Sequence, residues 1–177
     1  MQMIKPRTVA TGIALAWIAL GAAPALADPA KDVQVAARAL GFLENAPHGA
    51  VVLGIVYDPG KPATVAERDA LMAAIGSGLT AGDLTITGKP IEASAVGGAG
   101  GMAALYVTTG SPYSEIGAAA SGKKLLTISS DKACAQSGAC VMSVVTTPAV
   151  EITVNHNAAT AVGATFKAAF RMMIKEI

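Results

Sequence analysis

Two unbroken apolar runs of strand length constrain the fold of this chain most strongly. The first covers residues 50–57 with the sequence AVVLGIVY, and the second covers residues 102–107 with the sequence MAALYV. Runs without polar alternation are typical of strands that are covered on both faces, as in a parallel sheet. Segments with helical spacing of apolar residues occur at 32–44, at 64–75 and, after the second run, at 111–121. Strands that alternate with helices predict parallel crossovers and therefore an α/β fold.

Several shorter patterns fill the first two thirds of the chain. Thr64-Val65-Ala66-Glu67 matches a capping box, in which the hydroxyl and the carboxylate bind free amides at a helix start. Residues 84–87 and 91–96 alternate like two strands around Gly88-Lys89-Pro90. The glycine-rich stretch 97–101 lacks the G-x-G-x-x-G spacing and precedes a strand, so it indicates a flexible loop rather than a dinucleotide site.

The last third of the chain predicts a strand, a cysteine-closed loop, a hairpin and a closing helix. The strand is expected at 124–128, and the hairpin strands at 141–145 and 150–155. Asn155 is expected to cap the closing helix, which runs from residue 158 to the end. Its apolar side chains recur at three- and four-residue intervals: Ala159, Val162, Phe166, Phe170, Met173, Ile174 and Ile177. The predicted fold is a single α/β domain with a mixed, mostly parallel sheet, helices on both faces, and a C-terminal hairpin plus helix.

The first 27 residues have the pattern of a signal peptide. Lys5 and Arg7 form a basic region, residues 9–23 are apolar, and Ala25-Leu26-Ala27 is a small-x-small cleavage site. A retained membrane anchor is the alternative, although Gly12, Gly21 and Pro24 argue against it. We therefore expect cleavage after Ala27 and a mature periplasmic domain of residues 28–177.

Charge and motif content narrow the function classes. Loss of Lys5 and Arg7 from the 13 Lys and Arg residues leaves 11 basic against 12 acidic side chains, so no basic stripe is expected to bind nucleic acid. No nucleophile elbow, Ser-His-Asp order or carboxylate pair stands out, and His48 and His156 lie too far apart in sequence to indicate a metal site. We expect a protein that is not an enzyme, with no catalytic residue, metal or cofactor.

Cys134 and Cys140 are the only cysteines and carry the strongest chemical signal. Two cysteines at this spacing in an exported chain predict a disulfide. Closure of the small ring is expected to stabilise the fold by about 2 kcal/mol. Two roles stay open, a structural staple and a redox switch.

Polar side chains follow three of the predicted strands and form a candidate ligand site. Ligands of open α/β sheets bind beyond the carboxyl ends of the strands. The turn at 56–60 also resembles the first strand-turn-helix unit of sugar-type periplasmic binding proteins. Those proteins have two lobes, and this chain is long enough for at most one of them. The same residue types also build turns and helix caps, which is the alternative. The candidate residues are Tyr57, Asp58, Thr108, Thr109, Ser111, Ser129, Ser130 and Asp131.

The last third of the chain resembles the YfiR-like family of periplasmic regulators. The matching residues are Leu126-Thr127-Ile128-Ser129, Gly138, Met142, the strand at 150–155, and Ala158-Ala159, whereas Ser143 and Val144 stand where the family commonly has Asn and an aromatic residue.

The resemblance implies a regulator that binds the extracytoplasmic domain of an inner-membrane sensor, such as a diguanylate cyclase or a histidine kinase, and represses it. It also implies cyclic di-GMP or related signalling and self-association as a homodimer. The alternative function is a single-lobe small-molecule-binding protein that feeds a transporter or sensor. A hydrolase with an unrecognised site is a third, weaker class.

Overall fold

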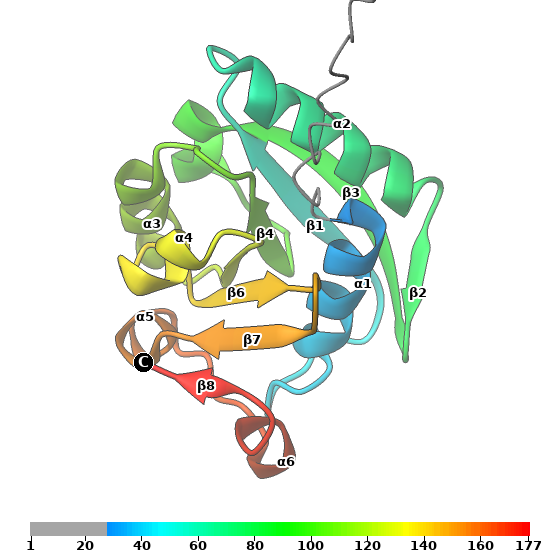
Figure 1. The fold of residues 1–177 in the computed structure, drawn as a ribbon, viewed down its shortest axis with the longest axis vertical. Coiled ribbons are helices and arrows are strands. Elements are labelled where there is room, and N and C mark those ends of the chain that lie inside the picture. The colour runs from blue at the N-terminus through cyan, green and yellow to red at the C-terminus, as the bar shows by residue number, and fades with distance from the viewer. Residues whose placement is uncertain (1–27) are drawn as a thin grey trace, which may run out of the picture.

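A computed structural model describes residues 28–177, and the expected signal peptide lies outside the described residues. The chain forms one eight-stranded sheet with the strand order β2-β3-β1-β4-β5-β6-β7-β8 (Figure 1). The strands are β1 Gly49–Tyr57, β2 Leu79–Ala81, β3 Leu84–Glu92, β4 Ala104–Val107, β5 Thr127–Ser129, β6 Met142–Val145, β7 Glu151–Val154 and β8 Lys175–Glu176. The helices are α1 Pro29–Leu40, α2 Pro62–Ile75, the 3-10 helix η1 Ala93–Gly98, α3 Tyr113–Gly122, α4 Lys132–Gln136, α5 His156–Val162 and α6 Ala168–Arg171.

The five central strands are parallel, which confirms the predicted mixed, mostly parallel α/β fold. β3, β1, β4, β5 and β6 pair in parallel, whereas β2 pairs antiparallel with β3 and β7 pairs antiparallel with β6. β8 adds a short parallel partner to β7 at the edge of the sheet. The predicted hairpin is therefore present, with β6 as the last member of the parallel set.

Both faces of the sheet are covered, as the unbroken apolar runs predicted. Consecutive residues of β4 belong to different cores: Tyr106 packs with α1 and α2, and Leu105 packs with α3 and the cysteines. Both side chains are at most 1% exposed. The first core also contains Leu40 of α1 and Phe170 of α6, and the second contains Ile116 of α3. No helix in the described part of the chain has the length and apolar character needed to cross a bilayer.

The prediction of one long C-terminal helix is wrong. α5 ends at Val162 because Gly163 takes a left-handed conformation with φ 75°, which terminates the helix. The chain then forms an isolated bridge between Phe166 and Leu43, the short helix α6, and β8. Three separate elements thus hold apolar residues that the sequence placed on one helical stripe.

The prediction of two strands around Gly88-Lys89-Pro90 is also wrong, because β3 runs through this segment without a break. β2 pairs only with residues 84–86, so the later part of β3 has one free edge. Proline has no backbone amide to donate, and Pro90 is tolerated because it lies in this edge segment. Gly88 lies close to α2, since a Cβ there would lie 2.7 Å from the sulfur of Met72, whose side chain would have to shift. η1 covers residues 93–96, which were expected to belong to the second strand, and the first two glycines of the expected loop at 97–101.

Candidate functional site

The candidate residues do meet at the carboxyl ends of β1, β4 and β5. We call this region the carboxyl-end edge, and it comprises residues 57–61, 108–113 and 129–132 together with the side chains of α2 that reach it. Parallel pairing of the three strands brings the loops together. Some side chains of this edge hold the loops through hydrogen bonds, and others remain available for contact.

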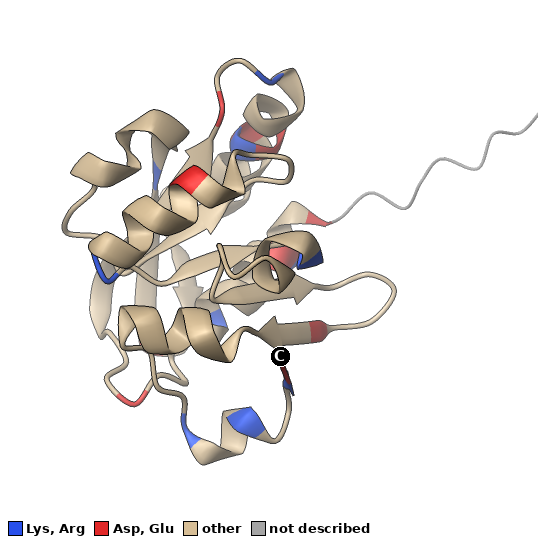
Figure 2. Cartoon of the chain, turned by 90° about the vertical axis from the view of Figure 1, so that its left-hand side faces the viewer, with Lys and Arg blue, Asp and Glu red and all other residues tan. Residues whose placement is uncertain are grey.

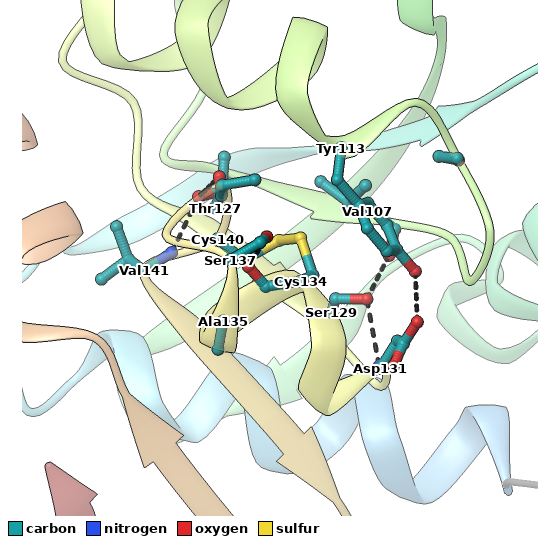
Figure 3. Close-up of a disulfide and its surroundings, with 12 residues drawn as sticks. Val107, Tyr113, Thr127, Ser129, Asp131, Cys134, Ala135, Ser137, Cys140 and Val141 are labelled. Carbon is teal, nitrogen blue, oxygen red and sulfur yellow. Dashed lines mark hydrogen bonds between the residues drawn. A yellow bond between two sulfur atoms is a disulfide. The ribbon is translucent and has the colours of Figure 1, made fainter. Parts of the chain in front are cut away.

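Thr108, Ser111 and Ser129 build the loops and are buried. The Thr108 hydroxyl donates to the Val56 carbonyl at 3.0 Å and lies 2.8 Å from the Ser111 hydroxyl. The Ser129 hydroxyl donates to the Val107 carbonyl at 2.8 Å and accepts from the amide of Asp131 at 3.1 Å (Figure 3). For these three residues the geometry supports the structural role, in which they make turns and caps, over a ligand-binding role.

Asp131 links two helices across the edge. Its Oδ1 accepts from the amide of Ala133 at 2.9 Å and so caps α4. Its Oδ2 accepts from the Tyr113 hydroxyl at 2.7 Å (Figure 3). The same hydroxyl accepts from the amide of Gly110 at 2.8 Å. Burial, followed by the Asp131 carboxylate, raises the pKa of Tyr113. Tyr113, which was not among the candidates chosen from the sequence, therefore acts as a neutral bridge between the loops after β4 and β5.

The turn after β1 is organised by Asp58 and Thr64. Asp58 Oδ1 accepts from the amide of Gly60 at 2.9 Å, and Oδ2 lies 3.7 Å from the Lys61 ammonium. The Thr64 hydroxyl accepts from the Asp58 amide at 3.1 Å and lies 2.7 Å from the Asp58 carbonyl, to which it can donate. α2 begins at Pro62, with Lys61 at its N-cap. The predicted capping box is wrong because Thr64 is already inside the helix and holds the preceding turn.

Glu67, the other half of that supposed capping box, reaches the carboxyl-end edge instead. Its Oε2 accepts from the Thr109 amide at 2.8 Å and its Oε1 accepts from the Ser130 hydroxyl at 3.2 Å. The hydroxyls of Thr109 and Ser130 lie 3.2 Å apart. One carboxylate thus ties α2 to the ends of β4 and β5. Burial raises the pKa of Glu67, while the hydrogen bonds from Thr109 and Ser130 oppose the increase.

The rim of the edge combines an aromatic ring with cations; Tyr57 and Arg68 are half-buried, and Lys61 is exposed. The Arg68 guanidinium lies over the Tyr57 ring, with its central carbon 4.2 Å from the ring centroid. The same guanidinium is held by Asp69, whose Oδ1 lies 2.6 Å from one of its terminal nitrogens. Lys61 donates to the Gly110 carbonyl at 2.8 Å and so bridges the loops after β1 and β4. The rim therefore presents a fixed aromatic–cation pair.

The edge has few free donors for a small anion. The amides of Gly60, Thr109, Gly110, Asp131 and Ala133 all donate to oxygens of the protein itself. Within residues 28–177 no group of three or more His, Cys, Asp or Glu side chains is arranged to hold a metal ion. Four surface cavities of the described part are lined by other residues. The arrangement suits contact between surfaces better than enclosure of a small molecule.

The predicted disulfide is confirmed. Cys134 and Cys140 are bonded and at most 1% exposed, and Cys134 lies in α4, a short helix that was not expected from the sequence (Figure 3). The amide of Cys140 donates to the carbonyl of Cys134 at 3.0 Å. Because α4 follows Asp131 directly, the bridged loop is continuous with the carboxyl-end edge.

Replacement of Glu67 with glutamine is expected to change the pH dependence of stability. The free energy of unfolding of the variant, compared with that of wild type, should increase as the pH rises. A raised pKa in the folded state means that this group stabilises the fold fully below the ordinary carboxyl pKa of 4.5, and that the contribution is lost as the pH rises through the raised value. Glutamine can still accept from Thr109 and can pair with Ser130, but it cannot ionise.

Urea denaturation of wild type and Glu67→Gln at several pH values measures this effect. The difference in unfolding free energy should move in favour of the variant from acid to neutral pH. Glu115→Gln, at an exposed position of α3, is the control and should change stability by less than about 0.5 kcal/mol. A difference that stays constant with pH would contradict the raised pKa.

Comparisons with known proteins identify the fold but no family. No family model and no curated protein matches the chain. A conserved domain protein from Vibrio cholerae matches 85% of the chain with a TM-score of 0.60 and 12% identity. A substrate-binding protein with adhesive properties from Clostridium difficile, in its ligand-free, open structure, matches 83% with a TM-score of 0.57 and 13% identity. An ABC domain from Streptococcus pneumoniae, in complex with L-Trp, matches 84% with a TM-score of 0.57 and 11% identity.

The chain shares its fold with these three structures, at identities that show the fold alone. The chain spans 60%, 58% and 60% of the length of these three structures, respectively. The disulfide is typical of proteins in oxidising compartments and therefore indicates an extracytoplasmic protein.

Proposed function

We propose that this protein is a non-catalytic, extracytoplasmic binding protein whose carboxyl-end edge docks onto a second protein. The observation that carries the proposal is the state of that edge: its loop amides are satisfied internally, while the Tyr57–Arg68 pair stays on the rim. An edge that is already hydrogen-bonded needs no small ligand to order it. Aromatic and arginine side chains are enriched at protein interfaces and among their strongest contacts.

The partner proposed for this edge is the extracytoplasmic domain of an inner-membrane sensor, a diguanylate cyclase or a histidine kinase, which the protein would repress from the periplasm. The support is the resemblance of the last third of the chain to YfiR-like regulators and a fold shared with a substrate-binding protein. Self-association as a homodimer belongs to the same proposal. The proposed activity involves no catalytic step and no cofactor.

A small-molecule-binding lobe is the second candidate function. Two of the similar structures favour it, since one is described as a substrate-binding protein and the other as a complex with L-Trp. Ligands of open α/β sheets bind outside the carboxyl ends of the strands, which is where Tyr57, Thr109 and Ser130 lie. The single lobe would then supply half of a site.

Site-specific photo-crosslinking in cells tests the docking proposal, because it captures a partner whose identity is not yet established. A photoreactive residue at Lys61, on the carboxyl-end edge, should give an adduct with a membrane sensor. The control is Lys123, an exposed residue that follows α3 at the other end of the sheet, and it should give none. Arg68→Glu should weaken the Lys61 adduct. Equal adducts from both positions would contradict docking through this edge, and a metabolite that raises the melting temperature without any adduct would favour the second candidate.

Export makes a separate prediction. If Ala25-Leu26-Ala27 is the cleavage site, the mature chain should begin at Asp28, one residue before α1. Mass spectrometry of the protein from a periplasmic extract checks this start. Recovery of the chain from membranes with Met1 still attached would instead support the retained anchor.

A further inference from the structure

A cavity of about 460 Å³ lies at the amino ends of the strands, away from the carboxyl-end edge. We call it the amino-end cavity. Three segments that are distant in sequence surround it: the C-terminal end of α1 with the loop that follows, the β2–β3 hairpin, and the chain just before α6. The amide of Gly49, at the start of β1, donates to the Asp83 carbonyl at 3.1 Å and holds the hairpin in place. The lining residues are Arg38, Gly41, Phe42, Ala46, Pro47, His48, Ala81, Gly82, Asp83, Leu84 and Lys167.

One side of the amino-end cavity is apolar and rigid. Ala81 and Leu84 are buried parts of the first core, and Phe42 packs against that core while lining the cavity. The Phe42 ring stacks on the ring of Phe170, with the centroids 5.0 Å apart, and this contact fixes the position of the Phe42 ring. A volume of this size and an apolar wall are typical of small-molecule sites.

The other side of the cavity is basic. Arg38, His48 and Lys167 line it against a single carboxylate, Asp83. Basic residues also gather around α6, which follows Lys167 (Figure 2). Lys167 donates to the Gly41 carbonyl at 3.0 Å, which fixes its ammonium at the end of α1. Among residues 28–177, neither Arg38 nor His48 makes a side-chain hydrogen bond or an ion pair, so the guanidinium keeps all its donors for another group.

Two other cavities in the described part of the chain do not combine these properties. In a larger cavity, of about 520 Å³, the Arg171 guanidinium is already paired with Glu176 at 3.0 Å. The cavity beside Lys124 has only about 140 Å³, and the Lys124 ammonium donates to the Ala161 carbonyl. Only the amino-end cavity, among these three, joins an unpaired guanidinium to an apolar wall.

We propose that the amino-end cavity binds a compact organic anion with an apolar body, such as an aromatic carboxylate. The ring lies against Phe42 and Leu84, and the carboxylate faces Arg38, whose planar guanidinium can bind two carboxylate oxygens at once. Lys167 and His48 add positive potential around the same end of the ligand. This site is independent of the proposed docking function, because it uses the opposite end of the sheet.

Two probes that differ only in charge test the proposal on the mature domain. Naphthoate and naphthylmethanol share the aromatic body, and titration calorimetry measures the affinity of each. Naphthoate is expected to bind at least about tenfold more tightly, since hydrogen bonds between charged partners contribute more than neutral ones. Arg38→Gln should remove most of this difference, whereas Lys123→Gln, a matched loss of one exposed cation outside the cavity, should keep it. Ala46→Trp, which places an indole in the cavity, should weaken both probes.

Several outcomes would overturn the site. They are the absence of saturable naphthoate binding to wild type, equal affinities for acid and alcohol, or equal losses in Arg38→Gln and Lys123→Gln. The comparison of the two probes on wild type needs no variant, so it decides the matter even if a substitution disturbs folding. Photo-crosslinking at Lys61 is unaffected by any of these results, which keeps the two proposals separable.

Discussion

Replacement of Phe170 with alanine is expected to lower the free energy of unfolding by about 3–5 kcal/mol, the range for a fully buried phenylalanine. Phe170 is 1% exposed, although it lies on a helix of four residues. Its ring stacks on Phe42 at 5.0 Å and lies 5.2 Å from the ring of Phe166. The variant removes the side chain through which α6 joins the core beneath α1, so the effect should be among the largest of any single substitution.

Met173→Ala is the control for this experiment. Met173 is 62% exposed, and its truncation should change stability by no more than about 0.5 kcal/mol. Chemical denaturation of both variants gives the comparison. Equal losses, or an unchanged unfolding curve for Phe170→Ala, would place this face of the C-terminal segment outside the core, as a surface for a partner.

Removal of the disulfide is expected to cost about 2 kcal/mol. The double substitution Cys134→Ala with Cys140→Ala opens a ring of seven residues without leaving a free thiol, and the loop-entropy estimate gives this magnitude. Denaturation of the oxidised wild type and the double variant measures it. Thiol labelling of the resting protein without reductant should find no free cysteine.

The packing of the bridged loop favours a staple over a switch. Both cysteines belong to the second core, and a Cβ added at Gly117 of α3 would lie 2.7 Å from the Cα of Ala139, inside the loop. α3 therefore presses directly on the loop and leaves it little room to open. Partner affinity should accordingly survive in the double variant at low temperature. A tenfold change in affinity, about 1.4 kcal/mol, on reduction of a still-folded protein would contradict the staple.

The location of the carboxyl-end edge could be predicted from the sequence, because parallel strands bring their carboxyl ends to one edge. The roles of its residues could not be predicted in this way. Glu67 stands three residues after Thr64 and matched a local capping pattern, yet its carboxylate binds the Thr109 amide 42 positions away. Tyr113 likewise showed no local signal, since its partners Gly110 and Asp131 belong to two different loops.

Local sequence patterns were sufficient to predict the parallel centre of the sheet, the helices on both faces and the disulfide. Unbroken apolar runs and helical periodicity report which faces of a single element are buried. They can therefore be recognised without knowing which other element packs against those faces. The C-terminal segment instead depends on tertiary contacts, although the spacing of Phe166 and Phe170 suited a helix. Gly163 ends that helix, Phe166 forms a bridge with Leu43, and Phe170 stacks on Phe42. These contacts join the C-terminal segment to a loop more than a hundred residues earlier in the chain, and they outweigh the local helical periodicity. A window of neighbouring residues contains only one partner of each contact, so the sequence pattern could not reveal them.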